Sequence, residues 1–141
     1  MKQSINLLRS RGLTLFELLV VLAILSLLAT IVAPRVVGYL GKAKGDVAES
    51  QLANLAASLE LFYLDFGRYP TENEGLKLLV EKPNELPDWN GPYFKSISGL
   101  VDPWGRPYLY SVDNSNIFAL TTLGRDGKEA GDGEDEDIVV H

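Results

Sequence analysis

The chain has 141 residues, 46% of them hydrophobic, and carries a formal net charge of −6. That acidic balance argues against nucleic acid as a partner, because a phosphate backbone must be neutralised by Lys and Arg. Cysteine is absent, which excludes thiol catalysis, and the single histidine, His141, argues against a histidine-based catalytic site. Without disulfides, a small exported domain would need a metal, oligomerisation or a very good core.

The first element is an apolar run from Leu13 to Ala33, preceded by the basic residues Lys2, Arg9 and Arg11. A run of about 20 apolar residues can span a bilayer as a helix. The positive-inside rule keeps the basic start in the cytoplasm, so the rest of the chain faces outward. Glu17 lies near the start of the run, where an unpaired acid costs about 2.5 to 3.5 kcal/mol. It therefore needs a partner.

Two other kinds of segment share some of these features. A secretory signal peptide has an apolar region of about 7 to 15 residues that ends in a small-residue cleavage site, which fits this run poorly. A plain single-pass anchor fits the hydropathy better, but it leaves Gly12 and Glu17 unexplained.

The sequence from Arg11 to Leu25, RGLTLFELLVVLAIL, resembles the processing site of type IV pilins and pseudopilins. The resemblance implies that a prepilin peptidase cleaves after Gly12 and methylates the new amino terminus at Leu13. It also implies that Glu17 pairs with the amino terminus of a neighbouring subunit during assembly. Residues 1–12 are then a basic leader, and losing its three positive charges changes the net charge from −6 to −9.

The helical pattern continues beyond the predicted transmembrane and assembly helix, residues 13–34. Pro34 is expected to kink or locally unwind the helix, and Gly38, Gly41 and Gly45 each weaken it by about 1 kcal/mol, which predicts a flexible section. Residues 35–67 are predicted to continue as an amphipathic helix that ends at Gly67. Its apolar stripe, with spacings of three and four, comprises Ala48, Leu52, Leu55, Leu59, Phe62 and Phe66.

Residues 68–141 are predicted to hold shorter elements. Thr71 and Glu74 form a capping-box pattern for a short helix through Val80. Trp89 and Trp104 lie among turn residues and are interpreted as satellite core rather than a sugar-stacking surface. The β-forming segments are 108–112 and 117–122, a hairpin around 113–116, and 138–140, which could return to the sheet.

Motifs in this half resemble the major pseudopilins of type II secretion systems. The resemblance implies an α+β, type IV pilin-like fold, in which a long N-terminal helix packs on a small antiparallel sheet and calcium holds a C-terminal loop. The matching motifs are Tyr69-Pro70-Thr71, Gly75-Leu76, Leu79-Val80, Tyr93-Phe94, Asp102-Pro103-Trp104-Gly105, Pro107-Tyr108 and Leu123-Gly124-Arg125-Asp126-Gly127.

The acidic segment from Leu123 to Asp137 is the predicted calcium loop. Calcium takes six to eight oxygen ligands, which an acidic, glycine-rich loop can offer. The EF-hand spacing is not met, and on composition alone such a run is usually a solvated tail. The family resemblance places the ligands at Asp126, Asp137, Asp132, Asp135 and the Leu123 carbonyl.

Three functions are compatible with these features. The first is a structural, non-enzymatic subunit of the periplasmic pseudopilus of a type II secretion system, which drives export of folded proteins across the outer membrane. The alternatives are a type IV pilus or competence pilin, and a membrane-tethered calcium-binding domain. The resemblance implies as partners copies of the same chain, minor pseudopilins, the inner-membrane assembly platform, the prepilin peptidase and, before assembly, membrane lipid. It implies a single-pass protein of the bacterial inner membrane, with its N-terminus cytoplasmic and its C-terminal domain periplasmic.

Overall fold

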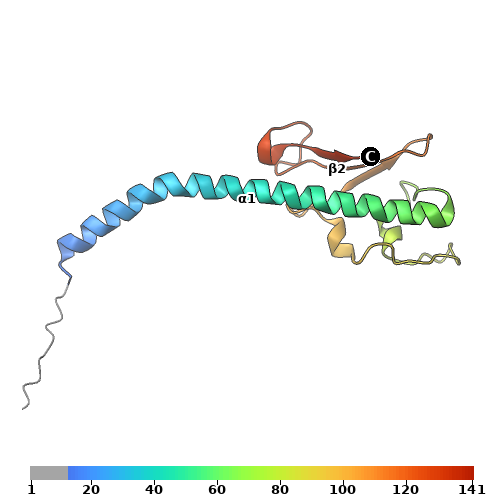
Figure 1. The fold of residues 1–141 in the computed structure, drawn as a ribbon, viewed down its shortest axis with the longest axis horizontal. Helices are drawn as coiled ribbons and strands as arrows, with labels where there is room; N and C mark the ends of the chain where they lie inside the picture. Colours follow the sequence, from blue (N-terminus) through green and yellow to red (C-terminus); the bar gives the residue numbers. More distant parts are fainter. Residues whose placement is uncertain (1–12) are drawn as a thin grey trace, which may run out of the picture. The chain divides into compact units, whose positions relative to one another are not determined.

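The computed structural model describes residues 13–141; the predicted leader, including Gly12, lies outside the described residues. The described residues divide into two compact units, 13–38 and 39–141. The elements, in chain order, are α1 (Leu15–Phe66), η1 (Leu76–Leu79), η2 (Ile97–Leu100), β1 (Leu109–Val112), β2 (Phe118–Thr122), η3 (Gly133–Asp135) and β3 (Ile138–Val140) (Figure 1).

Helix α1 begins at a side-chain cap. The Oγ1 atom of Thr14 accepts a hydrogen bond from the backbone N–H of Glu17 at 3.2 Å, and the Thr14 carbonyl accepts one from Leu18 at 3.2 Å. Within residues 13–141, α1 is the one helix long and apolar enough to cross a membrane, and its most apolar 18-residue window has a mean hydropathy of 2.8. No side chain of that window is buried.

Of the two effects expected of Pro34, local unwinding does not occur, because residues on both sides of it are helical. A proline inside a helix removes one backbone hydrogen bond, here the one to Thr30, and the bonds before and after it can continue. Neighbouring hydroxyl groups often bond to backbone carbonyls in apolar helices. Here the Thr30 Oγ1 atom donates to the Leu27 carbonyl at 2.6 Å.

The second unit contains the hydrophobic core, and the predicted helical stripe provides one side of it. Five stripe residues are completely buried and Phe66 is partly buried against them. The helix ends where predicted, because Gly67 adopts a φ of 67° and donates its N–H to the Tyr63 carbonyl at 2.7 Å. The other members of the core cluster are Leu76, Leu78, Leu79, Leu100, Tyr108, Phe118 and Leu120.

A three-stranded antiparallel sheet, in the order β1-β2-β3, covers this part of α1. Figure 1 shows the strands in orange to red along one side of the green half of the helix, and the segment with η1 and η2 in yellow along another. Residues of β2 alternate between buried and half-buried positions, with Phe118 and Leu120 facing the core. Both the predicted hairpin and the return of 138–140 to the sheet are confirmed.

The segment between α1 and the hairpin differs from its prediction. The capping-box hydrogen bonds form between Thr71 and Glu74, but they close a turn, and the helix that follows is a four-residue 3-10 helix. Gly75 is the cause, since its φ of 61° and ψ of −175° interrupt the helical backbone directly before Leu76. The sequence did not predict the 3-10 helix η2.

Candidate functional site

The predicted processing and assembly motif lies at the start of α1. Leu13 and Glu17 are both exposed, and Glu17 occupies the first helical turn, where an acid interacts favourably with the helix dipole. Within residues 13–141, no ion pair involves Glu17. The capping role of Thr14 was not predicted, although Thr14 and Glu17 have the spacing of a capping box.

The acidic loop is closed by contacts between its two arms. The Arg125 N–H donates to the Glu134 carbonyl at 2.8 Å. Gly124 has a φ of 59°, and a Cβ there would lie 2.6 Å from the Asp135 carbonyl carbon. Glycine is therefore required at this position both for the backbone conformation and for the close approach of the second arm.

Two of the predicted ligands are held by backbone N–H groups within the loop. Asp126 Oδ1 accepts from Lys128 at 3.0 Å, and Asp137 Oδ2 accepts from Ala130 at 2.8 Å. In the described part of the chain, the second carboxylate oxygen of Asp137, Oδ1, is the buried side-chain oxygen that lacks a hydrogen-bond partner. Burying a carboxylate oxygen without a donor is costly, so this atom fits a bound cation.

The remaining predicted ligands are arranged less favourably for a metal. Asp135 forms a two-pronged ion pair with Arg125, with distances of 2.9 and 2.8 Å. Asp132 is exposed, and the Leu123 carbonyl accepts the Gly127 N–H at 3.1 Å. Across residues 13–141, the structure gathers no group of three or more acidic or histidine side chains around one point. The five predicted ligands are therefore not brought together as one set.

The base of the acidic loop is held by an arginine that the sequence analysis missed. Asp102 is buried and accepts hydrogen bonds from the Arg106 N–H at 2.8 Å and from the Thr122 hydroxyl at 2.7 Å. The Arg106 guanidinium donates to the carbonyls of Gly124 and Arg125. An aspartate at the start of a turn commonly accepts from backbone N–H groups further along, and Asp102-Pro103-Trp104-Gly105 carries that signal.

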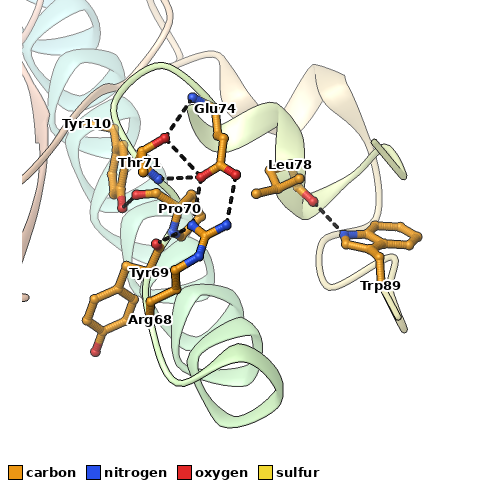
Figure 2. Close-up of polar contacts among 8 residues, drawn as sticks. All are labelled: Arg68, Tyr69, Pro70, Thr71, Glu74, Leu78, Trp89 and Tyr110. Carbon is orange, nitrogen blue, oxygen red and sulfur yellow. Dashed lines mark hydrogen bonds and ion pairs between the residues drawn. The ribbon is translucent and has the colours of Figure 1, made fainter. Parts of the chain in front are cut away.

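A polar cluster around Glu74 fixes the segment that follows α1 (Figure 2). Arg68 donates to both carboxylate oxygens of Glu74, at 2.7 and 2.9 Å, and Thr71 donates through its N–H and its hydroxyl. The hydrogen bonds from Arg68, helped by those from Thr71, lower the pKa of Glu74 to about 2. The same contact raises the pKa of Arg68. These groups satisfy one another's hydrogen-bonding capacity, so we interpret the cluster as structural.

Two further hydrogen bonds in Figure 2 connect this segment to the rest of the second unit. The Tyr110 hydroxyl donates to the Pro70 carbonyl at 2.6 Å, and burial raises the pKa of that hydroxyl to about 12. The Trp89 indole donates to the Leu78 carbonyl at 2.9 Å and packs on the core, which confirms it as satellite core. Trp104 lies outside the core cluster and donates instead to Glu134 at 3.3 Å.

The family model for type II secretion system (T2SS), protein G, matches residues 35–141, and a model of the prokaryotic N-terminal methylation motif matches residues 7–33. The chain belongs to the type II secretion system protein G family. Its relatives include the type II secretion system core protein G of Pseudomonas aeruginosa, 42% identical over 90% of this chain and 92% of the relative. The core protein G of Vibrio cholerae is 37% identical over 92% and 90% of the two chains.

A solved structure is similar as well. The major pseudopilin from the type 2 secretion system of enterohaemorrhagic Escherichia coli aligns with a TM-score of 0.55 and 29% identity, covering 73% of this chain and 90% of that one. The predicted family and fold, a long N-terminal helix on a small antiparallel sheet, are confirmed. The chain is thus a membrane-anchored, non-enzymatic subunit of a pseudopilus in type II secretion.

Proposed function

We propose that this chain polymerises with copies of itself to form the body of a periplasmic pseudopilus, whose growth drives folded proteins across the outer membrane. The observation that carries the proposal is the apolar segment of α1, which buries none of its side chains within one chain. Such a segment must be covered by lipid or by other helices. Polymerisation exchanges the first environment for the second.

A second surface supports contacts between copies. In the second unit, Leu61 is 52% exposed and Leu64 is 77% exposed, although both lie on the helix whose other face forms the core. The neighbouring Ala57 is also exposed, so this face of α1 is apolar and contains a small residue. Side chains of this kind pack well against another helix.

The same features support a proposed topology and proposed partners. The basic residues before the span favour a cytoplasmic start, a single pass through the bacterial inner membrane and a periplasmic C-terminal domain. The peptidase that processes the leader, the inner-membrane assembly platform and minor pseudopilins are the proposed partners in assembly. Membrane lipid surrounds the span before assembly.

The Glu17 carboxylate is proposed to pair with the methylated amine of Leu13 in a neighbouring copy. No basic residue occurs in the sequence between Glu17 and Arg35, so the span itself offers no counter-charge. A buried carboxylate in an apolar environment requires one. An amine supplied by the next subunit would make the pairing a product of assembly.

Calcium is proposed as the cation of the acidic loop. Support comes from the unpartnered buried Oδ1 of Asp137 and from the density of acidic residues, seven between Asp126 and Asp137. Asp126 and Asp137 are the principal proposed ligands, and the Leu123 carbonyl is a further one. Asp132 is accessible, whereas Asp135 would have to leave its ion pair with Arg125 to bind the cation directly.

Export in living cells tests the proposed function. Removal of the gene is expected to leave secreted proteins in the periplasm, and the wild-type chain is expected to restore their export. The Glu17→Ala variant is expected to be made and inserted without restoring export. Full export without any copy of this chain would contradict a role in secretion, and long surface filaments at native expression would favour a pilus subunit instead.

A further inference from the structure

The carboxylate of Glu134 lies at a junction of three parts of the second unit. Glu134 belongs to η3 in the acidic loop, and its side chain is 19% exposed. Its Oε1 atom accepts the indole N–H of Trp104 at 3.3 Å, and its Oε2 atom lies 3.2 Å from Arg125 Nη1. Glu134 is not among the predicted calcium ligands.

The third contact is with helix α1, at Gly41. Gly41 is buried, and a Cβ at this position would lie 2.6 Å from Glu134 Oε2 and 2.7 Å from its carboxylate carbon. A Cβ at Gly38 or Gly45 would meet no atom within 4 Å. Of these three helical glycines, Gly41 is thus the one whose missing side chain makes room for another residue.

We propose that Glu134 docks the acidic loop on helix α1. The missing side chain of Gly41 makes room for the Glu134 carboxylate. The adjacent turn of the helix contains Gly45 and has low intrinsic helix propensity, so it depends on tertiary contacts for its order. Glu134 supplies such a contact, while Trp104 and Arg125 fix its carboxylate. Order in the acidic loop and order in the helix near Gly41 are therefore coupled through this one side chain.

The coupling requires no bound cation, because every contact that makes it is between protein groups. Glu134 is a positioning residue: it holds the second arm of the loop, which carries Asp135 and Asp137, against the helix. A cation bound in the loop would add to this order. Failure of the calcium proposal would leave the docking contact in place.

Paired glycine substitutions in the full-length mature chain, in detergent micelles, test the proposal. Helix propensity alone predicts that Gly41→Ala and Gly45→Ala both raise the melting temperature. Docking predicts opposite signs: Gly45→Ala raises it, whereas Gly41→Ala displaces the Glu134 carboxylate and lowers it. An increase of equal size in both variants would overturn the proposal.

Paired glutamate substitutions provide a second, independent test. Glu134→Ala is compared with Glu136→Ala, which removes the same charge from an exposed position in the same loop. Hydrogen exchange of the peptide covering residues 39–47 is expected to be about tenfold faster in Glu134→Ala and unchanged in Glu136→Ala. In a Trp89→Phe background, Trp104 emission is expected to change only with Glu134→Ala.

Each comparison is made with calcium and with chelator. The difference between Glu134→Ala and Glu136→Ala is expected in both conditions, which separates docking from ion binding. Equal exchange and equal emission in the two variants would overturn the docking contact. If Glu134→Ala does not fold, the glycine pair still decides the question, because both of those substitutions add only a methyl group.

Discussion

Glu74 illustrates how single residues stabilise the second unit. Its carboxylate receives hydrogen bonds from Arg68 and from Thr71 at distances between 2.7 and 2.9 Å. The sequence predicted the Thr71 contact, because the capping-box spacing is local. It did not predict Arg68, since that contact depends on how the chain turns after Gly67.

The lowered pKa of Glu74 predicts an acid-dependent stability. Its folded pKa of about 2 lies below the ordinary 4.5, so the ionised group stabilises the fold above pH 4.5 and loses this effect as the pH falls toward 2. Glu74→Gln is expected to lower the free energy of unfolding at pH 7 by about 1 kcal/mol, a modest value because the pair is partly exposed.

Thermal unfolding at pH 7, 4.5 and 2.5 measures this effect, with Glu72→Gln as the control. Glu72 is exposed in the same turn, and its loss is expected to change little at any pH. The deficit of Glu74→Gln is expected to shrink below pH 4.5. A deficit that is as large at pH 2.5 as at pH 7 would show that the charge is not the source of the stabilisation.

The amino terminus gives a second prediction at this scale. Cleavage between Gly12 and Leu13, followed by methylation, is expected in cells that contain the peptidase, because the methylation motif covers these residues. Intact mass of the membrane-extracted protein measures it, and Gly12→Ala is expected to accumulate uncleaved. A wild-type chain that still begins at Met1 or Lys2 in such cells would refute processing.

At the level of elements, periodic patterns were predictable and interruptions were not. The buried stripe of α1 and the hairpin follow from spacings of three to four and of two, which depend on side-chain position along a regular backbone. The short helix predicted after Thr71 forms only as a 3-10 helix that begins at Leu76, because Gly75 breaks the backbone where the capping signal suggested continuity. At Pro34 the helix continues through a residue that usually disrupts helices.

In the acidic loop, composition predicted which residues are acidic but not which contacts they form. Its acidic residues were easy to find in the sequence, but the contacts of the loop were not. Arg125 forms an ion pair with Asp135, Arg106 donates to the carbonyls of Gly124 and Arg125, and Glu134 contacts Gly41. These contacts join residues that are between 10 and about 90 positions apart, and local spacing carries no information on them.

Calcium is expected to stabilise the second unit through this loop. Binding to the folded state alone adds about 2.7 kcal/mol at a hundredfold excess over the dissociation constant. Asp126→Ala and Asp137→Ala are each expected to lower the melting temperature in calcium and to remove its calcium-dependent part. Thermal unfolding with calcium and with chelator measures this, and Glu136→Ala serves as the control. Equal midpoints of the wild type in both conditions would mean that no such site exists.

In the molecule as a whole, the two units differ in how their apolar side chains are buried. The second unit buries its own apolar stripe, whereas the apolar segment of α1 in the first unit buries none of its side chains within the chain. In a monomer, only lipid can cover the apolar side chains of that segment. Assembly into a filament would offer it other helices, and the proposed pairing of Glu17 with an amine would remove the main electrostatic obstacle to burial.

Electron microscopy of cells that overproduce the chain, with antibody labelling, is the most direct test of polymerisation. We expect filaments labelled along their whole length, which contain many copies beginning at Leu13. Glu17→Ala is expected to insert and fold, because the substitution removes a charge from lipid, but to form no filaments. A wild-type chain that remains monomeric under these conditions, or filaments formed equally well by Glu17→Ala, would contradict the account.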